Sequence, residues 1–123
     1  MSGWSEFEVK RVKHERPEVL IYRMSGVLSD SKPAYAFLAE FREEVSDAPH
    51  TVVINLKGVP HINSGGVGIL AACFTSVTNA GGRMCLVGLQ KRGRTVMQVV
   101  GLTKVIECHE SESEILQHLG AEQ

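Results

Sequence analysis

Two polar residues and two glycines, Asn63-Ser64-Gly65-Gly66, follow an apolar run and directly precede a helical pattern. A serine at such a strand-to-helix turn could act as a nucleophile, cap the helix or accept a phosphate. Asn63 and Ser64 are both suitable caps, because their side chains accept hydrogen bonds from free backbone N–H groups. A phosphate on Ser64 would lie at the positive end of the helix dipole, and we expect no carboxylate nearby to repel it. The residue types therefore leave a helix cap and a phosphorylation site both open.

Enzymatic chemistry fits this stretch poorly. The glycines match the dinucleotide-binding pattern G-x-G-x-x-A, but the acid expected about 20 residues later is missing, because no carboxylate occurs before Glu107. No Gly-Lys-Ser/Thr follows the glycines, which excludes a Walker loop. A nucleophile elbow needs a glycine where this chain has Ile62, and no nearby acid could orient His61 as a base. The histidines also lack metal-ligand spacing, so we expect no enzyme, no cofactor and no metal site.

The elements that must position this turn alternate between strand and helix patterns, without internal repeats. Alternating or β-branched runs predict strands at 7–9, 19–24, 51–56, 83–89 and 104–108. Helical spacing and capping residues predict helices at 32–46, after the central glycines, at 91–100, and from the capping box at 111–114 onward. We expect the second helix to use one apolar face made of Val67, Leu70, Ala71, Phe74 and Val77, and the third to carry Val96, Val99 and Val100. This rhythm indicates an α/β fold.

Length and composition fit one domain spanning residues 1–123, because a chain with 43% hydrophobic residues can bury a core without disulfides. Cys73, Cys85 and Cys108 form an odd set without C-x-x-C spacing, and they are interpreted as buried reduced thiols. The sequence shows no apolar leader and no run long enough for a membrane helix. We therefore expect a cytoplasmic protein without membrane insertion.

Charge is distributed in blocks although the net charge is only −1. No Asp or Glu occurs from Ala48 to Ile106, where six basic residues lie, so this middle carries +6 and the flanks carry −7 (7 basic minus 14 acidic residues). The blocks could pair with each other across the fold, or the middle could present a basic surface to a partner. Direct binding to nucleic acid is not expected.

Three motifs in order carry a family resemblance. They are the strand VVINL followed by Asn63-Ser64-Gly65-Gly66-Val67-Gly68, then AGGRMCLVGL, then VVGLTKV. The chain resembles STAS domains, the family of bacterial anti-sigma-factor antagonists, which show V-V-L-D-L, D-S-S/T-G-L-G and A-G-G-x-L-x-L-V-G in this order. The upstream SGVLSD is similar to the family's G-x-L-D, with Ser29 at the acidic position and Asp30 one place later. The resemblance implies an α/β domain with a mixed central sheet of about four to five strands and about four helices.

The resemblance also implies a protein that switches partners. Ser64 matches the family serine that an anti-sigma factor serine kinase phosphorylates and a serine phosphatase restores, and the unmodified form binds the anti-sigma factor. The implied binding residues surround this serine: His61, Asn63, Ser64, Gly65, Gly66 and Val67, with a basic contact at Lys91, Arg92 and Arg94. Asn63 and Gly65 replace the family Asp and Ser/Thr. The alternative is a non-switching STAS scaffold in a stress-sensing or lipid-transport complex, and a homodimer stays open.

Overall fold

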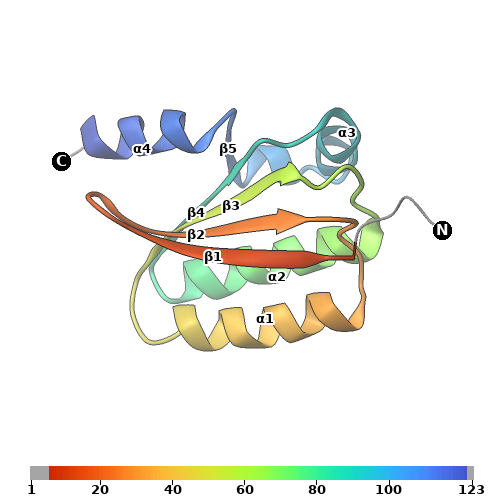
Figure 1. Cartoon of the computed structure of the whole chain (residues 1–123), viewed down its shortest axis with the longest axis horizontal. Helices are drawn as coiled ribbons and strands as arrows, with labels where there is room; N and C mark the ends of the chain where they lie inside the picture. Colours follow the sequence, from red (N-terminus) through yellow and green to blue (C-terminus); the bar gives the residue numbers. More distant parts are fainter. Residues whose placement is uncertain (1–5, 122–123) are drawn as a thin grey trace.

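The computed structural model describes residues 6–121, which form a five-stranded mixed sheet with helices on both faces (Figure 1). The strands follow chain order across the sheet: β1 (Glu8–Glu15), β2 (Glu18–Ser25), β3 (Thr51–Gly58), β4 (Arg83–Val87) and β5 (Glu107–His109). The helices are α1 (Lys32–Val45), α2 (Ser64–Asn79), α3 (Lys91–Val99) and α4 (Glu112–Ala121), with a short 3₁₀ turn, η1 (Leu102–Lys104). This architecture confirms the expected α/β fold and mixed sheet.

Strand direction follows from the connections. β1 and β2 are antiparallel and joined by a tight turn, whereas β2 to β5 are parallel, with α1, α2 and α3 in the three crossovers. A parallel strand that is covered on both faces has a continuous apolar sequence, because successive side chains on both sides are buried. In β3, Val52, Val53 and Ile54 are all buried. The carboxyl ends of β2, β3 and β4 meet at one edge of the sheet, where α2 and α3 begin (Figure 1).

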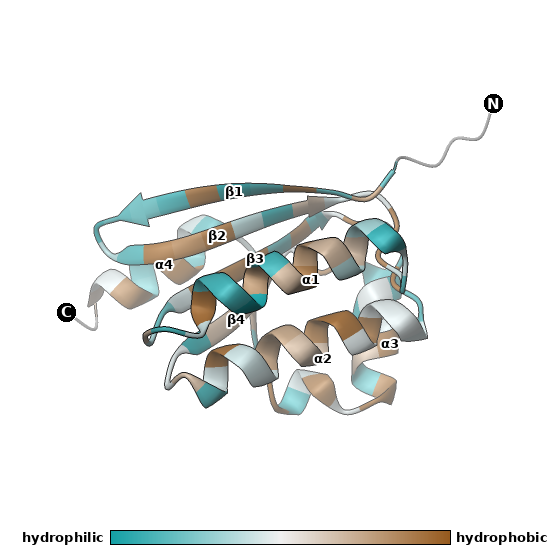
Figure 2. Cartoon of the chain, turned by 90° about the horizontal axis from the view of Figure 1, so that it is seen from below, coloured by the Kyte–Doolittle hydropathy of each residue, from teal (hydrophilic) through white to brown (hydrophobic). Residues whose placement is uncertain are grey.

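Two apolar cores hold the layers together. α1 and α2 lie side by side on one face of the sheet (Figure 2). Their buried apolar residues belong to one core cluster with those of the strands. Tyr22, Phe37 and Phe41 form an aromatic cluster there, with ring centroids 5.0–5.7 Å apart. α4 covers the opposite face and buries Ile115 and Leu119. Within residues 6–121, no helix combines the length and apolar character that crossing a membrane requires.

The predicted contact face of the second helix is partly wrong. Leu70 and Val77 are buried as expected, but the other buried side chains of α2 are Ile69 and Cys73. Of the remaining expected members, Val67 and Phe74 are partly buried and pack against the core, whereas Ala71 is only partly buried. The rotation of α2 about its axis is set by the buried Gly66, a packing contact that apolar spacing does not reveal.

The expectation for α3 is also partly wrong. Val99 and Val100 are 81% and 53% exposed, while Gly93 and Met97 make the buried contacts of this helix. A helix of nine residues can bury only a narrow stripe of side chains. Its close approach to the core leaves little room for a side chain at Gly93. The helix does end before Gly101, as expected, and this glycine adopts the left-handed conformation with φ 79°. Cys73 and Cys85 are buried and Cys108 is partly buried, and all three are free thiols.

Candidate functional site: the turn before α2

Asn63, rather than Ser64, caps α2. The Asn63 side-chain oxygen accepts a hydrogen bond from the Gly66 backbone N–H at 2.9 Å, and Asn63 has extended backbone angles. Ser64 is the first helical residue, and it is exposed. Capping therefore does not require the Ser64 hydroxyl, which stands in solvent at the amino end of the helix dipole.

A second loop is fixed against this turn by backbone hydrogen bonds. The Leu28 N–H donates to the His61 carbonyl at 3.1 Å, and the Asn63 N–H donates to the Leu28 carbonyl at 3.2 Å. These bonds form an isolated parallel bridge between Leu28 and Ile62, and both side chains are fully buried. We call this bridge the strap. It holds the loop between β2 and α1 beside the start of α2.

The two glycines of the turn are explained by close packing against this loop. A Cβ at Gly66 would overlap the Leu28 carbonyl, so no larger residue fits without moving the backbone. A Cβ at Gly65 would lie 2.5–2.6 Å from the Asp30 side chain. Gly68, by contrast, has open space around it. Both of the first glycines are thus required by neighbours within the fold.

Asp30 places a carboxylate directly over the first turn of α2. Its side chain covers Gly65, the residue after the exposed Ser64. The expectation that no carboxylate lies near Ser64 is therefore wrong, because the strap brings the β2–α1 loop to this turn. Asp30 restores a negative charge that Asn63 cannot supply, and it also excludes a second hydroxyl-bearing side chain at position 65.

The start of α3 lies against the same turn. Gly93 packs on Ile62, since a Cβ at Gly93 would lie 3.0 Å from the Ile62 Cδ1. His61, Lys91 and Arg92 line one shallow depression together with Thr95 and Val96. The structure therefore brings two of the three expected basic residues to the turn, and both are exposed.

Arg94, the third expected basic residue, is engaged differently. Its guanidinium lies 3.5 Å from the Glu110 carboxylate, beyond β5. Arg83 likewise forms an ion pair with Glu107 at 2.9 Å. The basic middle of the chain is thus partly neutralised by its acidic C-terminal flank, while Lys91 and Arg92 keep their side chains in solvent beside the turn.

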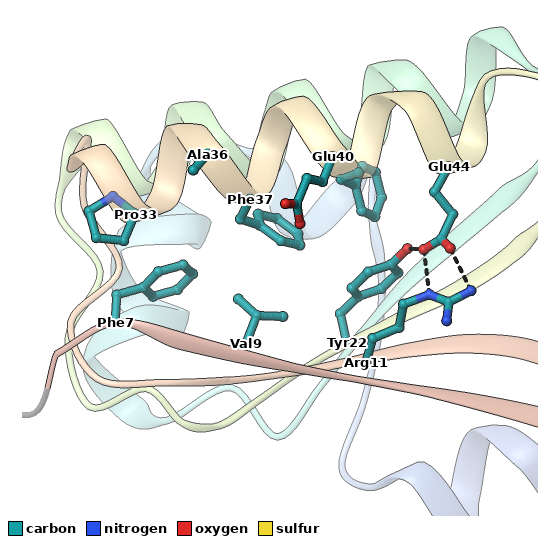
Figure 3. A pocket seen from close by; sticks show the side chains of 10 residues that line it. Phe7, Val9, Arg11, Tyr22, Pro33, Ala36, Phe37, Glu40 and Glu44 are labelled. Carbon is teal, nitrogen blue, oxygen red and sulfur yellow. Dashed lines mark hydrogen bonds and ion pairs between the residues drawn. The ribbon is translucent and has the colours of Figure 1, made fainter.

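A separate groove of about 360 Å³ lies between β1 and α1, away from the turn (Figure 3). Its floor is aromatic and aliphatic, and one end is closed by Arg11, Tyr22 and Glu44. Arg11 donates to Glu44 at 2.6 Å, and the Tyr22 hydroxyl donates to the same oxygen. Burial alone would raise the pKa of Glu44, but these hydrogen bonds outweigh it and hold that pKa below its ordinary value. None of the expected site residues lines this groove.

Several solved structures share this fold. An anti-sigma factor antagonist from Mycobacterium paratuberculosis is 23% identical over 92% of this chain and 93% of its own, with a TM-score of 0.77. SpoIIAA, an anti-sigma factor antagonist solved in its unphosphorylated form, is 20% identical over 94% and 97% of the two chains, with a TM-score of 0.75. RsbS from Moorella thermoacetica is 13% identical over 92% and 97%, with a TM-score of 0.76. The family model for the STAS domain matches residues 10–115, and this chain therefore belongs to the STAS domain family.

Proposed function

We propose that this chain is an anti-sigma-factor antagonist that works by partner switching. In its unmodified form it binds an anti-sigma factor serine kinase, and phosphorylation of Ser64 releases it until a serine phosphatase removes the phosphate. The observation that carries this proposal is the exposed Ser64 hydroxyl at the first position of α2, whose cap is supplied by Asn63. The anti-sigma factor antagonists among the similar folds support the same class.

The direction of the switch follows from charge. A phosphate adds a charge of about −1.5 to −2 to a surface that already carries the Asp30 carboxylate. A partner that covers Ser64 would have to desolvate both groups, so phosphorylation weakens its binding. The contact surface consists of His61, Asn63, Gly65 and Val67 around the serine. The buried Gly66 contributes through packing alone.

Lys91 and Arg92 extend this surface with positive charge. Exposed charges beside an interface accelerate association with an oppositely charged partner more than they strengthen the final complex. We therefore assign these two residues to the approach of the partner. Arg94 is a weaker candidate because it already faces Glu110.

A second candidate function is a STAS scaffold subunit without a phosphorylation cycle. The position of Asp30 favours this alternative, because a carboxylate against the first turn of α2 opposes the introduction of a second anionic group beside it. In such a scaffold, Asp30 itself would supply the anionic charge that interacts with the amino end of α2. The two candidates differ in whether Ser64 is modified in cells.

The decisive experiment is mass spectrometry of the chain recovered from cells and after incubation with ATP and candidate serine kinases. The switch predicts phosphate on Ser64 and none in the Ser64→Ala variant. Ser76 is a matched internal control on the same helix, because its hydroxyl donates to the Ala72 carbonyl at 2.9 Å. Calorimetric titration with the kinase should show binding by Ser64→Ala and at least tenfold weaker binding by Ser64→Asp. Phosphate confined to other residues, or equal binding by the two variants, contradicts the switch.

A further inference from the structure

The sheet brings a thiol, a carboxylate and an imidazole together beneath α4. Cys85 on β4 is paired directly with Glu107 on β5, and His109 follows two residues later on the same face of the strand. One ligand atom from each of these side chains lies within 4.8 Å of the other two. The His109 Nε2 and a Glu107 carboxylate oxygen are only 2.5 Å apart. These residues lie outside the turn before α2.

We propose that Cys85, Glu107 and His109 form a binding site for one transition-metal ion of the Zn²⁺ class, with an open fourth position. Zn²⁺ binds thiolate, imidazole and carboxylate at about 2.0–2.3 Å, and three protein ligands with one open position are typical of its non-structural sites. Ligand atoms on a tetrahedron of that size lie roughly 3.4 Å apart. Side-chain adjustments of about 1 Å therefore suffice to bring the three groups onto one ion.

Neighbouring residues already orient two of the ligands. The Glu114 carboxylate on α4 lies 3.1 Å from the His109 Nδ1, an arrangement that directs Nε2 toward Glu107 and Cys85. Arg83 donates hydrogen bonds to Glu107 at 2.9–3.0 Å. A carboxylate offers about four lone-pair sites, so Glu107 can keep contacts with Arg83 while it coordinates an ion. Supporting partners of this kind are regularly found behind metal ligands.

Binding requires the thiol to lose its proton. Burial raises the pKa of the Cys85 thiol to about 12, so this group is protonated in the metal-free protein. The metal–sulfur bond forms as the thiol proton leaves to solvent, and any proton on the His109 Nε2 leaves in the same way. The thiolate and the Glu107 carboxylate then balance the two charges of the ion, while Arg83 and Glu114 balance each other. The site is reachable, because the Glu107 side chain is 33% exposed.

Cobalt titration tests this site. The untagged full-length chain, freed of metal with a chelator, should bind one Co²⁺ and develop a thiolate-to-cobalt charge-transfer band that Zn²⁺ then removes. Cys85→Ser should abolish the band, and Glu107→Gln should weaken binding at least tenfold. Cys108→Ser is the matched control and should retain the band, because Cys108 lies between Glu107 and His109 but points to the other face of β5. Circular dichroism confirms that each variant is folded.

The proposal is overturned if the native chain shows no charge-transfer band at millimolar Co²⁺, or if Cys85→Ser retains it. A second readout does not depend on any variant. Paramagnetic Co²⁺ should broaden the NMR signals of residues 85, 107 and 109 first. Broadening centred on His14 or His50 would assign the binding to surface histidines and overturn the site as well.

Discussion

Asp30 should destabilise the phosphorylated form of this protein by about 1 kcal/mol. Its carboxylate oxygen lies 2.6 Å from the position of a Gly65 Cβ, and consecutive Cα atoms are about 3.8 Å apart, so we take roughly 6 Å as the working separation between this carboxylate and a phosphate on Ser64. At that distance in water, a charge of −2 and a charge of −1 repel by about 1.4 kcal/mol. Screening at about 0.1 M salt reduces this to about 0.8 kcal/mol.

The repulsion can be isolated with four proteins. They are the native chain and Asp30→Asn, each with serine or phosphoserine incorporated at position 64. Urea unfolding of each gives a double-mutant cycle whose coupling energy reports the interaction between the two groups. We expect phosphorylation to cost the native chain about 0.8 kcal/mol more than it costs Asp30→Asn. Asparagine keeps the shape of the side chain, so the packing against Gly65 is preserved.

Salt provides the control. At 1 M salt the Debye length falls to about 3 Å, and the coupling should drop to about 0.2 kcal/mol. Asp47→Asn is a matched exposed variant at the other end of α1 and should show no coupling. A coupling indistinguishable from zero at 0.1 M salt, or one that ignores salt, would refute this electrostatic account of the turn.

Four further predictions address the packing and charge of the fold. Gly66→Ala should destabilise the protein by more than about 2 kcal/mol, because the added Cβ meets the Leu28 carbonyl. Gly68→Ala should be neutral or stabilising by up to about 1 kcal/mol, because the space around Gly68 is open. Urea unfolding measures both changes. Gly65→Ala should cost about 1–2 kcal/mol, and the same change in an Asp30→Gly background should cost less, because the Asp30 side chain from its Cβ outward lies 2.5–2.6 Å from the added Cβ. Hydrogen bonds from Arg23 and then Asn55 outweigh burial and lower the pKa of Glu112. This carboxylate therefore stabilises the fold above pH 4.5, and the stabilisation is lost as pH falls through the lowered pKa. Glu112→Gln should remove this contribution, which is under about 1 kcal/mol, from the pH dependence of stability in thermal melts from pH 6 to 2. Neutralising Lys91 and Arg92 should slow association with an acidic partner several-fold at low salt in stopped-flow measurements, and an unchanged rate would remove these residues from the interface.

The sequence predicts the type and order of the elements well because their patterns are local, but it misses the bounds of the two outer strands: β1 extends to Glu15, and β5 begins only at Glu107. The continuous apolar run of β3, the capping residue Ser31 and the left-handed Gly101 are each readable within a few positions. The helix start predicted at Ser111 is also confirmed, since the Ser111 hydroxyl accepts from the Glu114 N–H at 3.1 Å, but the Glu114 carboxylate lies against His109. What such patterns predict less well is the rotation of a helix about its axis. The exposure of Val99 depends on how α3 packs, and its own sequence does not contain that information.

At the turn before α2, too, the sequence predicts the local features but not those that depend on packing between distant segments. Sequence identifies Ser64 and two suitable caps, and local geometry then decides that Asn63 is the cap. The carboxylate of Asp30 could not be placed from the sequence, because its position depends on the strap between two loops. A signal was nevertheless present: Gly65 replaces a family Ser/Thr, and SGVLSD carries its acid one position late. These two departures fit together, since a side chain at position 65 would collide with Asp30.

The strap makes the geometry around Ser64 depend on the folded state of the domain. Leu28 and Ile62 belong to loops that α1 and β3 separate along the chain, so the geometry around Ser64 requires this part of the domain to be folded. A linear peptide spanning Ser64 lacks the Leu28 carbonyl that holds the Asn63 backbone. Under the proposed switch, a kinase that recognises this geometry would modify native molecules alone. Phosphorylated Ser64 would then be found only on folded molecules.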